Sequence, residues 1–343
     1  RRLAQEIETF TIGFSEPSYD ESEFARVVAN HVGSRHHEQI LDLDVARDLI
    51  PSVLSRLDEP HSDASILPTY VLSAFTRERV TVALSGDGGD ELFAGYDPFV
   101  ALKPAALYAA LVPRPIHVLL RFLAEHMPRS SRNMSLDFKI RRTLMGLSQP
   151  ESAWAPAWMA PIDPDVVGEL FEQPVRPEDL FSEAMELWET GPAQGRVDRL
   201  LQFFTTFYLQ DDILAKVDRA SMMSSLETRA VFLDNDVVDF ARRLPSNFKY
   251  RNGQRKYLLK KALAPLLPPR IIERRKKGFG IPLADWMRKV PQTPPFDPIP
   301  GIRPAWMKRA WQDHRVGRAD HRLALWTWLS LQHTLRASAR TEH

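Results

Sequence analysis

An apolar stretch that ends in a glycine-rich acidic loop limits what this 343-residue chain can fold into. The stretch reads Val80-Thr81-Val82-Ala83-Leu84, and it is followed directly by Ser85-Gly86-Asp87-Gly88-Gly89-Asp90-Glu91. An apolar and β-branched run of this length predicts a strand buried on both faces of a parallel sheet. The glycines after it permit positive φ angles and let a ligand approach the backbone closely.

The carboxylates of this loop suggest a bound ligand. In open α/β sheets, ligands bind outside the carboxyl ends of the strands, which is where the loop would lie. Asp87, Asp90 and Glu91 would repel one another unless a cation or a cationic substrate group shares the site. Oxygen ligands of this kind suit Mg²⁺ held together with nucleotide phosphates. A solvated acidic turn explains the same residues, because Asp and Gly are common turn formers, and the loop alone leaves both interpretations open.

Composition argues against several classes of protein. The chain contains no cysteine, so disulfides, thiolate metal sites and a cysteine nucleophile are excluded within these residues. A formal net charge of +1 gives no field that calls for nucleic acid or an anionic membrane. No apolar run is as long as a membrane span, since residues 105–112 are followed by Pro113, and no signal peptide opens the sequence. We therefore expect a cytoplasmic protein with no membrane or nucleic-acid partner.

The first hundred residues alternate between strand and helix patterns. Strands are predicted at 9–14, 38–43 and 80–84, with helices at 45–57, bent at Pro51, and at 66–76. Another helix is predicted to begin after Asp20, which forms a capping-box pattern with Glu23, and to end at Gly33. This order of elements is typical of a parallel sheet wound by crossover connections.

The remainder of the chain reads as mostly helical. Amphipathic patterns predict helices over 115–126, 200–214, 236–244 and 256–266, with a closing helix over 323–335. The prolines of residues 291–304 predict a surface linker. The aromatic residues fit a core better than a cofactor cage.

Three further polar stretches can carry chemistry, although each also has a plain structural explanation. Residues 57–65 read as a helix cap with Ser62 or Asp63 in the capping position. The charges of residues 209–221 read as surface ion pairs. Residues 273–280 contain a basic run that is typical of a solvated face, but its glycines and phenylalanine leave a phosphate-facing loop open. His36, His37 and His61 have no ligand-like spacing, and a zinc site is not expected.

Taken together, these stretches resemble the synthetase (C-terminal) domain of glutamine-dependent asparagine synthetases of the class B type. The resemblance rests on Asp58-Glu59-Pro60, Ser85-Gly86-Asp87-Gly88-Gly89-Asp90-Glu91, the segment from Asp211-Asp212 to Asp234, and Arg274-Arg275-Lys276-Lys277-Gly278-Phe279. It covers essentially the whole chain. It implies an α/β fold with a parallel sheet of the adenine-nucleotide α-hydrolase-like type and a large helical remainder. Residues 1–100 would form the nucleotide-binding α/β part, and residues 101–343 the mainly helical part of the same domain.

The resemblance also implies ATP-dependent amide formation. Aspartate would be activated as β-aspartyl-AMP with release of pyrophosphate, and ammonia would then attack to give asparagine and AMP. Adenylation supplies the leaving group that a carboxylate lacks, and departing pyrophosphate needs cationic stabilisation from Mg²⁺ and a lysine. The implied cofactors are ATP and Mg²⁺. The implied partners are aspartate, ATP, ammonia and a glutaminase domain in the parent chain, and a homodimer is left open.

By the same match, each expected site residue has a position in this sequence. The implied catalytic residues are Asp87, Lys276 and Glu227; the ATP-binding residues are Ile12, Ser85, Gly86, Gly88 and Lys276; and the metal ligand is Asp90. Lys276 would contact the phosphates and Ile12 would lie beside the adenine. Asp87 stands at the position tied to formation of the intermediate, while Glu227 and Arg229 are weaker candidates that would organise the site.

Two parts of the family pattern are missing from this sequence. The pyrophosphate loop, serine-glycine-glycine-x-aspartate-serine, would stand just before Arg1, and the glutaminase domain opens with a catalytic cysteine. We therefore expect the chain to be part of a longer protein and, by itself, to complete neither adenylation nor glutamine hydrolysis. Val231 stands where the family usually has proline, and we expect only a slightly different backbone there.

Two other functions stay open. β-Lactam synthetases and other amide-forming relatives use the same adenylation core on different carboxylates, and the sequence does not specify the acid. A non-catalytic interaction domain that keeps the sheet is the alternative from a different class. A nucleic-acid role has little support, because the basic run after Glu273 is short and the net charge is close to zero.

Overall fold

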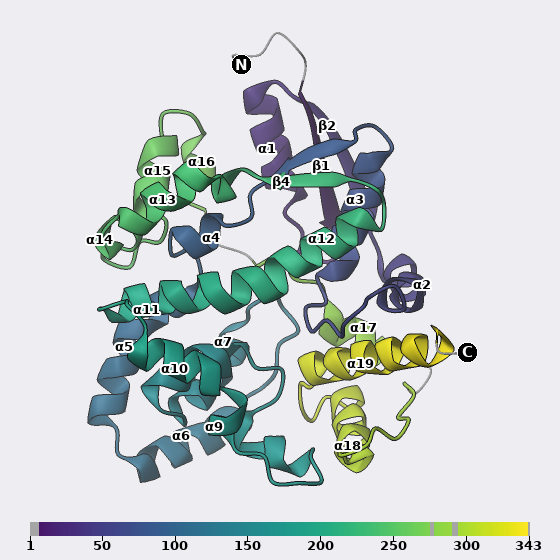
Figure 1. The fold of residues 1–343 in the computed structure, drawn as a ribbon, viewed down its shortest axis with the longest axis vertical. Coiled ribbons are helices and arrows are strands. Elements are labelled where there is room, and N and C mark those ends of the chain that lie inside the picture. Colours follow the sequence, from purple (N-terminus) through teal and green to yellow (C-terminus); the bar gives the residue numbers. More distant parts are fainter. Residues whose placement is uncertain (1–6, 275–277, 290–293, 342–343) are drawn as a thin grey trace.

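The structure is a computed structural model, and it describes residues 7–274, 278–289 and 294–341 of the chain. It belongs to the α/β class, with small parallel sheets and a large helical part (Figure 1). Strands lie in the upper half of Figure 1, and most helices fill the lower half and the left side. Among the described residues, no helix is both long enough and apolar enough to cross a bilayer.

Two pairs of parallel strands form the sheets. β1 (Glu8–Phe14) pairs with β2 (Arg35–Leu41), and β3 (Val82–Ser85) pairs with β4 (Glu227–Ala230). Helices α1 (Ser22–Val32), α2 (Leu43–Leu54) and α3 (Ile66–Arg77) connect β1, β2 and β3 in the predicted order. The prediction of a parallel sheet wound by crossover helices is confirmed for β1, α1 and β2, but β3 lies in a separate sheet with β4 instead of joining them.

The predicted glycine stop of α1 is confirmed, but the predicted capping box of Asp20 and Glu23 is wrong, because the capping residue is Glu21 and its side chain makes no capping hydrogen bond. Asp20 accepts hydrogen bonds from the backbone N–H and the hydroxyl of Ser22, at 3.1 and 2.9 Å. Gly33 ends the helix in the left-handed conformation, with φ of 73°, and its N–H donates to the carbonyl of Ala29. A residue with a β-carbon pays a steric penalty in this conformation, which is why glycine marks the end of the helix.

The prediction that the strand before the acidic loop is buried on both faces is wrong. In β3, Val82 and Leu84 are 41% and 73% exposed. Within the described residues, β3 pairs only with β4, so one of its edges has no neighbouring strand. An apolar run shows that a strand prefers burial, but the neighbouring elements decide how much burial it obtains.

The remaining helical segments follow in chain order. They are α4 (Gly89–Leu92), α5 (Asp97–Leu111), α6 (Arg114–Glu125), α7 (Leu136–Leu147), η1 (Glu151–Ala153), α8 (Trp154–Met159), η2 (Pro164–Glu169), α9 (Pro177–Leu180), α10 (Ser182–Thr190), α11 (Arg196–Phe203), η3 (Phe204–Leu214), α12 (Ala215–Met222), η4 (Val231–Leu233), α13 (Asn235–Arg243), α14 (Ser246–Lys249), α15 (Tyr257–Leu263), α16 (Pro269–Ile272), α17 (Leu283–Lys289), α18 (Pro304–Arg315) and α19 (Arg322–Thr341). The helices predicted from amphipathic patterns are all present.

A single long helix crosses the middle of the molecule. It is formed by α11, η3 and α12, which follow one another without a break (Figure 1). Its central segment η3 is π-helical, so the backbone there is wider than in an α-helix. Leu200 and Phe204 pack in one hydrophobic cluster, whereas Ala220 packs in another. The helix therefore joins two separately packed parts of the molecule.

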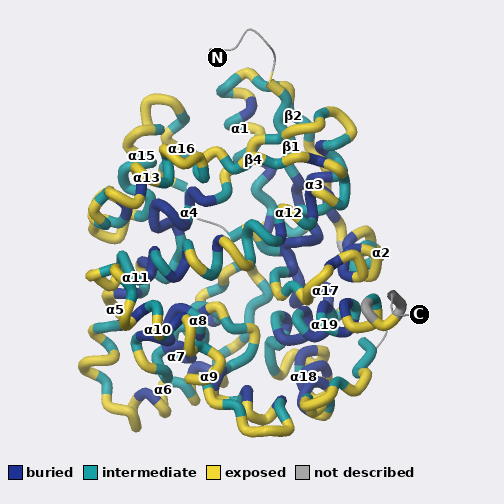
Figure 2. The backbone as a smooth tube through the Cα atoms, in the orientation of Figure 1, coloured by how far each residue is buried: buried dark blue, intermediate teal, exposed yellow. Residues whose placement is uncertain are grey.

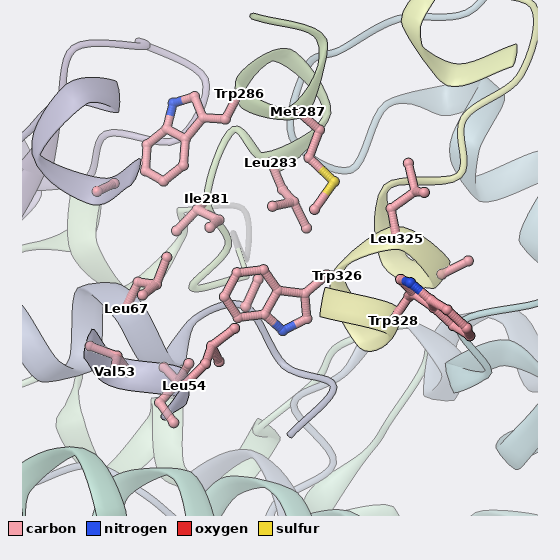
Figure 3. Packing of buried hydrophobic residues seen from close by; sticks show 14 of the residues in the cluster. Val53, Leu54, Leu67, Ile281, Leu283, Trp286, Met287, Leu325, Trp326 and Trp328 are labelled. Atoms are coloured by element: carbon pink, nitrogen blue, oxygen red, sulfur yellow. The ribbon is translucent and has the colours of Figure 1, made fainter. Parts of the chain in front are cut away.

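The larger hydrophobic cluster joins the α/β part to the carboxyl-terminal helices. Figure 2 shows buried positions along α3 and along α17 to α19. Trp326 of α19 is fully buried, and Figure 3 shows it between Leu54, Leu67 and Leu283. The expectation that the aromatic residues form a core is confirmed.

The prediction of a surface linker over 291–304 is wrong for the residues that the structure describes. Phe296, Ile299 and Ile302 pack against the larger cluster, and the Phe296 ring lies 6.2 Å from that of Trp328. Prolines prevent regular secondary structure, but they do not prevent the apolar residues between them from packing.

Candidate functional site

The acidic loop leaves the carboxyl end of β3 and turns into α4. Gly88 adopts φ of 86°, a conformation that favours glycine. A β-carbon at Gly88 would lie 2.3 Å from a methyl group of Leu233, and one at Gly89 would lie 3.1 Å from the ring of Phe232. These glycines therefore let the loop backbone pack directly against η4. A β-carbon at Gly86 would meet no atom within 4 Å, so the backbone there is open to a ligand.

The three carboxylates of the loop do not share one position. The Ser85 hydroxyl donates to Asp87 Oδ2 at 2.7 Å. The Lys256 ammonium lies 3.0 Å from Asp90 Oδ1. Glu91 is buried and accepts a hydrogen bond from the Tyr96 hydroxyl. The three acids therefore contact three different groups, one of which, the Lys256 ammonium, is a cation.

The other predicted site residues lie at different places. Glu227 begins β4 opposite Val82, three residues before the end of the pairing, and its carboxylate pairs with Arg229 at 2.8 Å. Three residues of a strand span about 10 Å, so Glu227 is separated from the start of the acidic loop by this distance along the sheet. Ile12 is buried in β1 within the larger hydrophobic cluster. Lys276 lies outside the described residues.

A partly buried polar cluster lies where the long central helix meets the loop before α3; Lys216 and Ser65 are buried in it, whereas the other side chains keep some exposure. The Lys216 ammonium donates to Asp63 Oδ2 at 2.7 Å and to the Ser65 hydroxyl oxygen at 2.8 Å. His61 Nε2 lies 3.2 Å from Asp212 Oδ1. Lys216 comes from α12 and Asp212 from η3, so the π-helical segment and the helix after it both contribute. We call these five residues, His61, Asp63, Ser65, Asp212 and Lys216, the lysine cluster.

Charges inside the lysine cluster shift one another's proton affinity. Burial raises the pKa of Asp63, but attraction to Lys216 and hydrogen bonds outweigh this effect and hold the pKa below its usual value. Burial lowers the pKa of Lys216, yet Asp63 and Asp212 raise it above its usual value. Burial raises the pKa of Asp212, and the nearby Asp63 charge adds to the shift. Lys216 also feels the charge of Asp87, so the cluster and the acidic loop are electrostatically linked.

The same cluster contains three side chains that could hold a metal ion. Ligand atoms of His61, Asp63 and Asp212 lie within 4.8 Å of one another. The Lys216 ammonium already contacts Asp63, however, so a divalent cation would have to bind beside a positive charge. The carboxylates of the lysine cluster are therefore better explained as partners of the Lys216 ammonium than as ligands of a metal ion.

Sequence patterns assigned the lysine cluster to ordinary structural roles. The helix that follows, α3, has Ser65 in the capping position, and Asp63 accepts from the backbone N–H of Ser65 instead of capping the helix itself. The interpretation of residues 209–221 as surface pairs fits Arg219, which pairs with Asp58 at 2.9 Å, but is wrong for the buried Lys216. The contact between Asp63 and Lys216 spans 153 positions, and no local pattern reports it.

The family of the chain follows from comparison with known proteins. The family model described as Asparagine synthase matches residues 1–336. The chain belongs to the asparagine synthase family. The match agrees with the resemblance that the sequence motifs indicate, including the acidic loop at the end of β3.

Individual relatives extend the comparison. Asparagine synthetase [glutamine-hydrolyzing] 1 of Bacillus subtilis is 26% identical over 94% of this chain and 51% of its own length. A putative asparagine synthetase [glutamine-hydrolyzing] of Mycobacterium tuberculosis is 30% identical over 94% of this chain and 49% of its own length. Amidase chyE of Penicillium rubens is 24% identical over 81% of this chain and 44% of its own length. The chain spans about half the length of the curated relatives it matches.

Proposed function

We propose that this chain is the synthetase part of an enzyme that converts aspartate to asparagine with ATP. The observation that carries the proposal is the family match over residues 1–336, combined with a serine- and glycine-rich loop at the carboxyl end of a parallel strand. Nucleotides bind at this position in open α/β sheets, because loops there expose backbone N–H groups to phosphates.

In the first step, an oxygen of the aspartate side-chain carboxylate bonds to the α-phosphorus of ATP, and pyrophosphate leaves. In the second step, ammonia attacks the acyl carbon of β-aspartyl-AMP, loses a proton, and AMP leaves. Adenylation is needed because a free carboxylate is a poor electrophile, and the AMP that leaves is a good leaving group. Glutamine hydrolysis in a separate glutaminase domain would supply the ammonia.

Each predicted residue has a role in this scheme. Ser85, Gly86 and Gly88 hold the nucleotide, and Ile12 contributes an apolar wall beside the adenine. Lys276 contacts the phosphates, and Asp87 acts in formation of the intermediate. Glu227 supports the arrangement from the neighbouring strand.

Mg²⁺ fits the acidic loop by the chemistry of its donors. Asp90 offers one carboxylate, and Mg²⁺ in nucleotide sites is commonly held by one or two carboxylates plus phosphate and water oxygens. When bound, the ion stabilises negative charge on the departing pyrophosphate. The Lys256 ammonium lies 3.0 Å from Asp90 Oδ1, so the ion would have to displace this ammonium or bind beside its positive charge.

The decisive experiment follows an oxygen label in the full-length protein. With ATP, Mg²⁺, ammonium and aspartate labelled with ¹⁸O in its side-chain carboxylate, we expect pyrophosphate and asparagine in equal amounts and one ¹⁸O atom in AMP. Label in inorganic phosphate, with ADP as the nucleotide product, would refute adenylation. Pyrophosphate release that does not depend on aspartate would refute the assigned substrate.

Two variants test the assigned residues in the same assay. Asp87→Asn and Lys276→Ala should each abolish pyrophosphate release while the far-UV circular dichroism stays unchanged. Asp239→Asn, which removes an exposed carboxylate from α13, is the matched control and should keep the activity. Wild-type turnover in either test variant would remove that residue from its role.

A further inference from the structure

Arg142 of α7 carries a positive charge that has no carboxylate partner. Its guanidinium donates to the carbonyl of Ala160, just after α8, and lies 3.8 Å from the sulfur of Met145. No carboxylate in the described part of the chain lies within ion-pair distance of Arg142, whereas its neighbour Arg141 pairs with Asp137 at 2.8 Å. Enclosed charges are normally paired, so the unpaired charge of Arg142 is exceptional.

A second guanidinium lies against the same aromatic ring. The guanidinium carbons of Arg142 and Arg322 lie 5.4 and 4.9 Å from the centre of the Phe138 ring. Arg322 opens α19, and Figure 1 shows the start of this helix on the side that faces α7. Arg322 is buried, pairs with Asp320 at 2.8 Å, and has an Nε that meets no acceptor among the described residues. We call Phe138, Arg142 and Arg322 the arginine site.

The surroundings of Arg142 disfavour its positive charge. Burial, followed by repulsion from Arg322, lowers the pKa of Arg142 to about 10. Asp320 and Asp163 oppose this shift, but the first pairs with Arg322 and the second with Arg121. A guanidinium stays protonated near pH 7, so the charge of Arg142 persists and attracts an anion. The side chain is only partly buried, which leaves it open to an anion from solvent.

The segment beside the arginine site indicates which anion this is. The Asn133 amide donates to the Gly278 carbonyl at 3.3 Å, and a β-carbon at Gly280 would lie 3.8 Å from the Tyr19 ring. The Tyr19 hydroxyl lies 3.4 Å from Arg322, so these two glycines lie next to the arginine site. They directly follow the basic run for which the sequence motifs predict phosphate contact. Two guanidiniums on one ring also suit the several oxygens of a phosphate group.

We propose that the arginine site binds inorganic pyrophosphate at a position separate from the acidic loop. The choice of pyrophosphate rests on the proposed function, because adenylation of a carboxylate releases this anion. Arg142 contacts the phosphate oxygens directly, and Arg322 adds positive charge behind it. Among the described residues, the charges that act on Arg142 are those of Arg322, Asp320 and Asp163, so the arginine site lies apart from the acidic loop.

A separate position for pyrophosphate has a chemical consequence. Pyrophosphate that stays beside the acyl-adenylate can attack its phosphorus, which re-forms ATP and the free carboxylate. Pyrophosphate held by Arg142 is removed from this phosphorus, so the intermediate survives until ammonia reaches it. The arginine site therefore serves the release of the first product.

Calorimetric titration of the full-length protein with pyrophosphate tests the arginine site. The protein is first saturated with Mg²⁺ and α,β-methylene-ATP, which fills the nucleotide site but cannot release pyrophosphate, and no aspartate is added. We expect one further pyrophosphate per chain, with a dissociation constant below about 1 mM. Absence of this binding overturns the proposal. Failure of the nucleotide analogue to bind would count against the proposed function, whereas the arginine site is judged by the pyrophosphate titration alone.

Four variants assign the binding to particular residues. Arg142→Gln should weaken pyrophosphate binding at least about tenfold, and Arg322→Gln should weaken it less, because Asp320 already neutralises Arg322. Arg142→Lys keeps the charge and should retain part of the affinity, which separates loss of charge from loss of fold. Arg132→Gln, at an exposed arginine in the loop before α7, is the matched control and should leave the affinity unchanged.

Two outcomes with these proteins contradict the assignment. Equal pyrophosphate affinity in the wild type and in Arg142→Gln, with unchanged circular dichroism, overturns the role of Arg142. Competition by aspartate but not by orthophosphate would show that the arginine site takes a carboxylate, and this would overturn the assignment to a phosphate anion.

Discussion

Replacement of Lys216 by methionine tests the central role of the lysine cluster in stability. Methionine keeps much of the length of the side chain but removes the ammonium that contacts Asp63 and Ser65. Loss of one partner of a buried ion pair costs about 3–5 kcal/mol, because the remaining charge stays buried without compensation. With a urea m-value of about 3 kcal/mol/M, the midpoint of unfolding should fall by about 1–1.7 M.

Arg219→Met is the matched control on the same helix. Arg219 also pairs with a carboxylate of the loop before α3, but both partners are exposed. Exposed pairs contribute about 0–1 kcal/mol, so the midpoint should fall by less than about 0.3 M. The double variant Asp63→Asn/Lys216→Met should recover a substantial part of the loss, since it also removes the unpaired carboxylate.

The pH dependence supplies an independent check. In the wild type, the folded pKa of Asp63 is below its ordinary value of 3.8 and that of Lys216 is above its ordinary value of 10.5. The pair therefore stabilises the fold fully between these two values and loses its effect as pH falls below the first or rises above the second. In Lys216→Met, the attraction of the ammonium is lost and burial of Asp63 is opposed only by the hydrogen bonds from Ser65, so we expect the folded pKa of Asp63 to rise above 3.8 and the variant to gain stability relative to the wild type as pH falls from 7 towards 4. Equal losses in Lys216→Met and Arg219→Met, or a constant gap across this pH range, would refute the reasoning.

Three other substitutions test single contacts. Gly88→Ala should destabilise the protein by about 1–3 kcal/mol in thermal unfolding, because its β-carbon would clash with η4 at a positive φ, whereas Gly86→Ala has open space and should cost less. Tyr96→Phe should cost about 1–3 kcal/mol, because it removes a hydrogen-bond donor from the buried Glu91, and an unchanged melting temperature would contradict this. His314→Gln should lower the free energy of unfolding by about 1–3 kcal/mol at pH 8 and by less at pH 5. Burial lowers the folded pKa of His314 below 6.5, so the wild type itself loses stability as pH falls through that range. A difference between the two proteins that grows on acidification would contradict this reasoning.

Local patterns in the sequence predicted the elements well. The strand at β1, the glycine that ends α1 and the closing helix α19 all depend on neighbouring residues, so their patterns are visible in the chain. The amphipathic pattern of α6 also predicted a helix. It could not show that the polar side faces inward, because that depends on acidic residues about forty positions away.

The candidate site was harder to read from the sequence. The acidic loop at the end of β3 was visible, since strand and glycines are contiguous. The separate partners of its carboxylates were not, because Lys256 comes from a distant part of the chain. The lysine cluster likewise combines His61, Asp63 and Lys216 through tertiary contacts, and each of these residues taken alone resembles an ordinary surface or capping residue.

The long central helix limits how the gene for this protein can change. Its α11 end is packed into one hydrophobic cluster, and its α12 end carries Lys216 and Ala220 into another environment. One residue corresponds to about 100° of helical rotation. An in-frame loss or gain of a single codon within η3 would therefore rotate the α12 end of the helix by about this angle relative to the α11 end. Substitutions between residues 196 and 222 change individual contacts, but a change of length there moves every contact beyond it. Length variation among descendants of this gene should therefore collect in the loops, while this segment keeps its number of codons.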